Sequence, residues 1–181
     1  FDGHLISHLK SAGFKGKRGN KSSFPTFGKI AADQLHILGT GDGENGALFL
    51  AATFAGRKAR EEGYTSIALA APGMATTELS LVIEGIQCGN YDYQLYKPSG
   101  EQKPTLETIT IAGVESNATT EDAAKRATIR SARQSFARDL INGPAADITP
   151  RALAEAAQSL SGLEGVTVDV WDFERCKRDG L

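Results

Sequence analysis

Apolar and polar positions alternate between helical and strand-like spacing along the chain. Apolar residues recur every three or four positions in the segments expected to be helices: 2–12, 45–62, 76–87, 120–142, 150–161 and a short one from Asp172. Short apolar or alternating runs predict strands at 24–27, 34–38, 66–71, 106–112 and 166–170, and residues 91–96 are a further candidate for extended chain. This alternation favours a layered α/β fold with a largely parallel sheet.

Two of the expected strands have a predicted place in a sheet. Pro25 confines the strand at 24–27 to a sheet edge, because proline cannot donate to a strand ladder. The continuous apolar run at 66–71 is typical of a central parallel strand that is covered on both faces.

Glycine, proline and threonine mark several of the expected helix ends. Gly63 follows the helix at 45–62 and stops it. Thr119 or Thr120 is expected to cap the long helix, and Gly143-Pro144 to end it with the glycine in the left-handed conformation. Thr149-Pro150 then places a cap residue before a first-turn proline, the preferred order at a helix start.

The break near residues 143–148 divides the expected elements into two groups. We expect an N-terminal α/β domain over 1–118, a linker helix and connector over 119–149, and the opening of a second α/β domain over 150–181. The last segment holds too few elements to bury a core of its own. We therefore expect it to be truncated or to pack on the first group.

Composition and charge narrow the class of protein. The 181 residues are 40% hydrophobic and 23% charged, which is typical of a globular chain and excludes a disordered one. No apolar run approaches the roughly 20 residues of a membrane span, so no membrane partner is expected. The net charge of −2 argues against a nucleic-acid partner. The only cysteines, Cys88 and Cys176, cannot build a disulfide framework, which favours the cytoplasm.

The segment Gly39-Thr40-Gly41-Asp42-Gly43 lies between an expected strand and an expected helix, where backbone amides can hold an anion. It lacks the third glycine of the dinucleotide fingerprint and the Gly-Lys-Ser/Thr of a P-loop, and Asp42 would repel a phosphate. We favour a tight turn over an anion site.

Histidines offer one candidate metal pair. His4 and His8 stand four residues apart on an expected helix, a spacing that can place two imidazoles on one metal, but no glutamate follows His4 as in the zincin pattern. We favour a helix surface without metal. His36 lies among apolar neighbours in an expected strand and is interpreted as a core or edge residue.

Clustered cations form two further candidates. Arg126, Arg130 and Arg133 share one face of the long helix, where they either face water or meet acidic groups of another domain or subunit; we favour water. A basic loop could touch nucleic acid, but Phe14 is the only aromatic within it. Its cations are Lys15, Lys17, Arg18 and Lys21.

Several segments resemble the leucyl aminopeptidase family (cytosol aminopeptidases, peptidase family M17). Ala-Arg-Asp-Leu-Ile-Asn-Gly-Pro at 137–144, followed by Ile-Thr-Pro-Arg-Ala-Leu-Ala at 148–154, is similar to the family's helix end and to the opening of its catalytic domain. Residues 13–17, 84–93 and 166–171 resemble further family segments in the same order.

The resemblance implies a macro-domain-like N-terminal α/β domain, with a mixed or parallel sheet flanked by helices, joined by a long linker helix to a C-terminal catalytic domain. That domain binds two divalent metals, zinc or manganese, and removes N-terminal residues from peptides in a homo-hexamer. The family signature Asn-Thr-Asp-Ala-Glu-Gly-Arg is absent from this sequence. We therefore assign no catalytic, cofactor-binding or metal residue within 1–181.

Two functions follow as hypotheses. In the first, this chain is the non-catalytic N-terminal portion of such an aminopeptidase and serves assembly and active-site access. Its partners are then its own catalytic domain, the other subunits of the hexamer and, in the intact enzyme, a peptide. In the alternative, the chain is a stand-alone module that binds a nucleotide or an ADP-ribose-like ligand through Gly39–Gly43.

Overall fold

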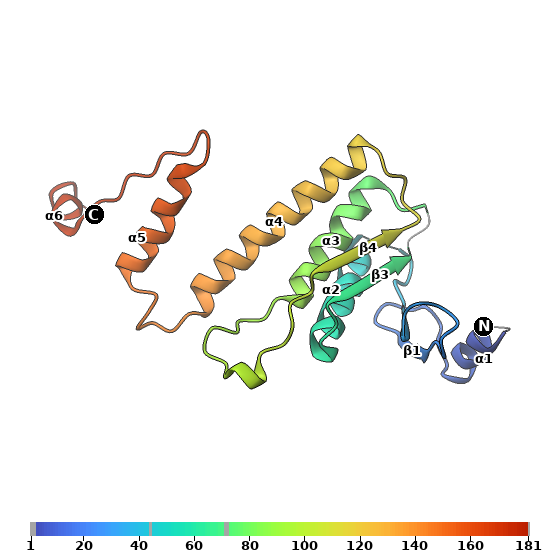
Figure 1. Cartoon of the computed structure of the whole chain (residues 1–181). Helices are drawn as coiled ribbons and strands as arrows, with labels where there is room; N and C mark the ends of the chain where they lie inside the picture. Colours follow the sequence, from blue (N-terminus) through green and yellow to red (C-terminus); the bar gives the residue numbers. More distant parts are fainter. Residues whose placement is uncertain (1–2, 44, 71–72, 181) are drawn as a thin grey trace. The chain divides into compact units, whose positions relative to one another are not determined.

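The computed structural model describes residues 3–43, 45–70 and 73–180 (Figure 1). The helices are α1 (His4–Ser11), α2 (Asn45–Glu62), α3 (Thr76–Asn90), α4 (Ala118–Asn142), α5 (Pro150–Gln158) and α6 (Phe173–Arg178), with short 3₁₀ turns at Ser99–Glu101 and Ser159–Gly162. The strands are β1 (Lys21–Pro25), β2 (Gln34–Leu38), β3 (Ser66–Ala70) and β4 (Thr108–Ala112). Two compact units divide at Ser135 and Phe136, and α4 runs continuously across that point.

The first unit contains two small sheets. β1 and β2 form an antiparallel hairpin in which Lys21 pairs with Leu38 and Pro25 with Gln34. β3 and β4 are parallel, from Ser66 opposite Thr108 to Ala70 opposite Ala112, and α3 lies in the connection between them. The helix-flanked mixed α/β fold with a long linker helix is thereby confirmed.

One face of the β3–β4 sheet supplies the base of the core. Ile67 and Leu69 of β3, with Ile109 and Ile111 of β4, pack against buried residues of α2 and α3. A second buried cluster joins α3 to α4. Its members are Leu79, Ile83 and Ala127, with Met74, Ile111, Val114 and Ala124 packed against them. Three helices therefore bury the same side of this sheet.

Glycines allow α2 and α3 to approach until their backbones touch. A Cβ atom on Gly89 would lie 2.8 Å from the carbonyl carbon of Thr53. One on Gly56 would lie 2.7 Å from the carbonyl carbon of Ile86, and one on Gly85 would lie 2.7 Å from the Cβ of Ala52. Real Cβ atoms essentially never come within 3.0 Å of such neighbours, so these positions of the interface require glycine. Ile86, at the centre, is fully buried.

The second unit consists of the end of α4, then α5, a 3₁₀ turn and α6. Thr149 Oγ1 accepts a hydrogen bond from the Ala152 amide at 3.2 Å, and Pro150 follows it, so the predicted cap is confirmed. Asp172 caps α6 in the same way, accepting from the Arg175 amide at 2.8 Å. None of the described residues 136–180 is buried.

Two sequence expectations about strands are wrong in detail. β1 begins at Lys21 and ends at Pro25, because Phe27 and Gly28 turn with φ of 52° and 73°. β3 alternates between covered and exposed residues and has one strand neighbour in the described part of the chain, so its outer face is not covered. Residues 91–96 form no strand.

Residues 166–170 also form no strand, contrary to expectation, because they find no pairing partner among the described residues. Contacts among the side chains of residues 169–175 stabilise this part of the backbone instead. Trp171 donates to Asp169 at 2.8 Å, and Arg175 stacks 4.2 Å from the Trp171 ring and pairs with Asp169 at 2.9 Å. These hydrogen bonds, first from Trp171 and then from Arg175, lower the pKa of Asp169.

Both expected features of the ends of α4 need correction. The cap is Asn117, whose Oδ1 accepts from the amides of Thr119 and Thr120 at 3.0 and 3.1 Å. Gly143 does end the helix, but it is not left-handed. A Cβ there would meet the Ile148 side chain, which would have to move to make room for it. The predicted stop at Gly63 is confirmed, with φ of 73°.

We expect Gly89→Ala to destabilise the first unit by about 1–3 kcal/mol, because the new methyl group meets backbone that cannot rotate away. The free energy of unfolding in urea measures this effect. Gly46→Ala on α2 is the matched control, since a Cβ there has no neighbour within 4 Å, and it should be neutral or slightly stabilising. Equal losses in both variants would contradict close packing as the cause.

Candidate functional site

The amides of the Gly39–Gly43 turn are mostly occupied by the chain itself. Gly39 N–H donates to the Asn20 carbonyl at 2.8 Å, and Gly41 N–H donates to the Gly16 carbonyl at 2.9 Å. Gly43 N–H points back to Thr40 at 3.3 Å. A Cβ on Gly39 would lie 2.7 Å from the Gly16 carbonyl oxygen. The glycines thus let two loops pack together, and donors already in use are poorly placed to cradle a phosphate.

The His4–His8 pair does not extend into a larger ligand cluster. His8 Nε2 lies 3.2 Å from Ser22 Oγ, and its ring meets the edge of Phe24 at 5.2 Å. This ring therefore packs on β1. Across the described residues, no group of three His, Cys, Asp or Glu side chains is placed to hold a metal ion. The expectation that the histidine pair binds no metal stays a prediction.

His36 belongs to β2, and its ring lies 6.5 Å from that of Tyr64, which follows the end of α2. The His36 Nδ1 is 2.8 Å from Ser23 Oγ, directly across the β1–β2 pairing, and its Nε2 is buried with no hydrogen-bond partner among the described residues. Burial lowers the pKa of His36 and the Lys58 ammonium lowers it further, while Glu62 opposes them. The ring is therefore held neutral and serves packing.

The three arginines of α4 have different surroundings. Arg130 reaches Glu84 of α3, with Nη2 2.5 Å and Nε 2.7 Å from Oε1. Arg126 pairs with Asp122 one turn earlier on α4, and Arg133 is exposed without an ion pair to any described residue. Arg130 is thus 58% exposed to water and also pairs with Glu84 of the neighbouring helix, so the preference for water stays a prediction.

The basic loop of the first unit remains exposed at Lys15, Lys17 and Arg18. Lys21 is part of β1, and its ammonium lies 4.6 Å from the centre of the Phe54 ring of α2. One of the four cations therefore makes a cation–π contact with α2.

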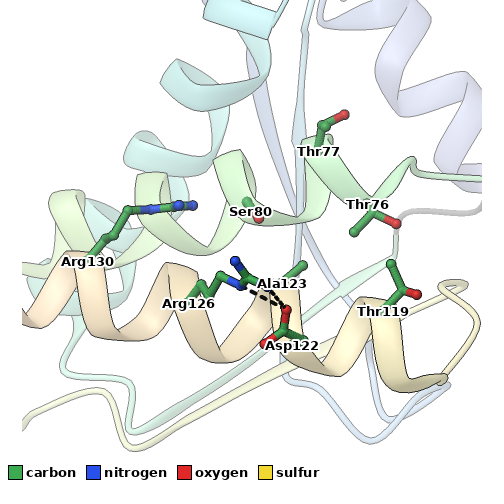
Figure 2. A pocket seen from close by; sticks show the side chains of 8 residues that line it. All are labelled: Thr76, Thr77, Ser80, Thr119, Asp122, Ala123, Arg126 and Arg130. Carbon is green, nitrogen blue, oxygen red and sulfur yellow. Dashed lines mark hydrogen bonds and ion pairs between the residues drawn. The ribbon is translucent and has the colours of Figure 1, made fainter.

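An open pocket of about 270 Å³ lies between the N-terminal halves of α3 and α4 (Figure 2). Its lining consists of hydroxyl groups, two arginines, one aspartate and one alanine: Thr76, Thr77, Ser80, Thr119, Asp122, Ala123, Arg126 and Arg130. The sequence analysis singled out both arginines of this pocket but not its four hydroxyl-bearing residues. No local signal could have found them, because residues some 40 positions apart meet only when α4 packs on α3.

The first unit has a mixed α/β fold, and the long helix α4 continues from it, which places the chain in the α/β class of proteins. Comparison with known proteins identifies the family. Residues 1–99 match the description "Cytosol aminopeptidase family, N-terminal domain". Because this match covers more than half of the chain, the chain belongs to the cytosol aminopeptidase family.

Relatives in bacteria agree with this assignment. A protein named "Probable cytosol aminopeptidase" from Streptomyces avermitilis is 28% identical over 194 residues, covering 99% of this chain and 38% of the relative. A protein of the same name from Solibacter usitatus is 33% identical over 102 residues, covering 56% of this chain and 21% of the relative. The chain thus spans well under half the length of these relatives.

Solved structures share the fold. A mutant of tomato leucine aminopeptidase matches with a TM-score of 0.84 at 23% identity, covering 98% of this chain and 36% of that one. The bottromycin maturation enzyme BotP, in complex with manganese, matches with a TM-score of 0.74 at 21% identity, covering 94% of this chain and 36% of that one. The fold of the N-terminal region of leucine aminopeptidases is therefore present here.

We expect acid to destabilise the first unit through His36. The pKa of His36 is lower in the folded chain than in the unfolded chain, where it is about 6.5, so the unfolded chain binds more protons as pH falls below that value. Stability is therefore retained above pH 6.5 and is lost below it, by at most about 1.4 kcal/mol per pH unit from this group. Unfolding in urea between pH 5 and 8 measures the loss.

His36→Gln is the matched variant, since a glutamine amide can still reach Ser23 but does not titrate. The slope of stability against pH should be shallower in this variant than in the wild type. Identical slopes would show that His36 is not held neutral by its burial.

Proposed function

We propose that this chain is the N-terminal, non-catalytic portion of a metal-dependent leucyl aminopeptidase, an enzyme that removes N-terminal residues from peptides. The observation that supports the proposal is the share of each protein that the alignment covers. The Streptomyces relative aligns with 99% of this chain but with only 38% of its own length. Most of an aminopeptidase's length therefore lies beyond the shared region.

The exposed apolar side chains of the second unit support a division at residue 150. Large hydrophobic residues stand on its surface with exposed fractions from 39% to 76% between Leu153 and Phe173. They are Leu153, Leu163, Val166, Val170, Trp171 and Phe173. Soluble proteins rarely leave so much apolar surface open unless another surface covers it. We propose that 1–118 is the N-terminal domain, 119–149 the linker and 150–181 the opening of the catalytic domain.

The metals of this proposal would be held elsewhere. The described residues do not fit a metal pair, because no three potential ligands of the kinds that bind zinc or manganese gather in them. We therefore place two divalent ions, zinc or manganese, in the catalytic domain.

The role of this portion is then assembly and control of access to the active site. α4 is 25 residues long and runs without a break from the first unit into the second, so one helix belongs to both. We propose a cytoplasmic homo-hexamer acting on peptides, with neither membrane nor nucleic acid as partner. Within the described residues, no helix is long and apolar enough to cross a membrane.

The nucleotide-binding alternative has less support. It depends on the Gly39–Gly43 turn, and three amide groups of that turn already donate to backbone carbonyls. The family match extends through the turn and beyond it, from residue 1 to residue 99.

The 181-residue chain, supplied with manganese or zinc, should release no detectable product from a leucine anilide. The same residues fused to their natural C-terminal continuation should hydrolyse it and should associate into hexamers, as measured by light scattering. The reason is that peptide hydrolysis of this kind needs metal-activated water and a stabilised oxyanion.

The non-catalytic role would be overturned if the 181-residue chain hydrolysed the substrate and if a substitution within it, such as His8→Ala, abolished this activity. Failure of the fused protein to turn over substrate with either metal would instead overturn the proposed enzyme activity.

A further inference from the structure

We propose that the β1–β2 hairpin is an acid-released element of the first unit: protonation of His36 detaches the hairpin from α2, while α2, α3 and α4 stay packed on the β3–β4 sheet. The loss of stability expected on acidification then falls on the hairpin rather than on the whole unit. This inference concerns only the first unit and does not depend on the proposed enzyme activity.

The hairpin lies outside the buried core of the first unit. In the described part of the chain, both buried clusters consist of residues from the β3–β4 sheet, its three helices and the adjoining segments, and none of their members comes from β1 or β2. Side chains attach the hairpin to α2 instead. The Lys21 ammonium lies 4.6 Å from the centre of the Phe54 ring, and the ring centres of His36 and Tyr64 are 6.5 Å apart. Loss of such a contact therefore affects the hairpin without opening the core.

His36 has one nitrogen that is hydrogen-bonded and one that is not. Nδ1 lies 2.8 Å from Ser23 Oγ across the β1–β2 pairing, and Nε2 is buried with no hydrogen-bond partner among the described residues. In the charged ring both nitrogens carry a proton, so Nε2 is then a cationic donor that meets no acceptor. Burying an unpaired cationic donor is costly, and release of the hairpin brings this group to water.

The charged groups that act on His36 among the described residues belong to the C-terminal end of α2. They are Lys58 and Glu62, which form an ion pair with each other, and Tyr64, which follows the helix, is the nearby titratable ring. Burial is the main cause of the lowered pKa of His36, the Lys58 ammonium lowers it further, and Glu62 opposes both. Because Glu62 is bound to Lys58, the cation offsets much of its influence. The docked hairpin therefore favours the neutral ring.

The same difference in pKa gives the direction of the switch. The pKa of His36 is below 6.5 in the docked hairpin and returns to about 6.5 when the ring reaches water. Between these two values the released form binds more protons than the docked form. The equilibrium constant for release therefore rises as pH falls, by at most about tenfold per pH unit for one proton. Above pH 6.5 the ring is neutral in both forms, and the hairpin stays docked.

The test measures amide hydrogen exchange of the 181-residue chain between pH 5 and 8, with each rate corrected for the intrinsic pH dependence of exchange. Protection of the β1 and β2 amides should fall by about three- to tenfold on acidification, because a two-stranded hairpin released from its support is marginal in water. Protection of the α3 amides around Val82 and Ile86 should stay within about twofold, because these residues lie in the core.

Four variants separate His36 from other causes of acid sensitivity. His36→Gln should make hairpin protection independent of pH. Glu62→Gln removes the charge that favours the protonated ring, so the acid-induced loss of protection should grow about twofold. Lys58→Gln removes the opposing cation and frees Glu62, so the loss should shrink about twofold. His8→Gln is the matched control, since His8 also contacts the hairpin, with Nε2 3.2 Å from Ser22 Oγ, and it should behave as the wild type.

Opposite effects of Glu62→Gln and Lys58→Gln, with an unchanged His8→Gln, would support release driven by His36. Equal acid-induced losses of protection in the hairpin and in α3 would overturn the proposal, because acid would then open the whole unit. Hairpin protection that does not change with pH in the wild type would also overturn it. If His36→Gln does not fold at pH 8, the two α2 variants still test the claim, since they replace partly exposed side chains.

Discussion

The close contact between α2 and α3 is the constraint on which the first unit depends. Gly56 on one helix, and Gly85 and Gly89 on the other, remove the side chains that would otherwise separate the two backbones. Ile86 and Val82 can then be fully buried beside Ala52, and the helix pair covers one face of the short β3–β4 sheet. A two-stranded sheet is marginal alone, so it depends on this helix layer for its stability.

The same contact determines where α4 can lie. Once α3 is fixed, Leu79 and Ile83 present an apolar surface that accepts Ala127, and the Glu84–Arg130 ion pair lies beside this contact. The open pocket between α3 and α4 is a product of this packing, since its lining residues share no local sequence pattern. In the second unit no described side chain is buried. The second unit therefore gains much less stability from its own buried residues than the first unit does.

Sequence reasoning succeeded where local chemistry decides the structure. The strand at 34–38 and the helix at 45–62 have the expected bounds, and Gly63, Thr149-Pro150 and Asp172 mark helix ends as predicted. It failed where distant residues decide. Residues 166–170 have strand-like alternation but no partner strand among the described residues, and Gly143 ends α4 without a left-handed backbone, packed close to the Ile148 side chain. The Thr76 and Thr119 hydroxyls share a pocket only through tertiary packing. The domain boundaries, and the absence of catalytic or metal residues, stay predictions.

Hydrogen exchange tests most directly the claim that residues 1–135 are stable alone while residues 150–180 need a covering domain. The measurement compares the 181-residue chain with the same residues fused to their natural C-terminal continuation. Amides of α2 and α3 should be protected in both proteins, whereas those of α5 and α6 should exchange rapidly in the shorter chain and slowly in the longer one. Equal protection of α5 and α6 in both proteins, or rapid exchange of α2 and α3 in the shorter chain, would contradict the account.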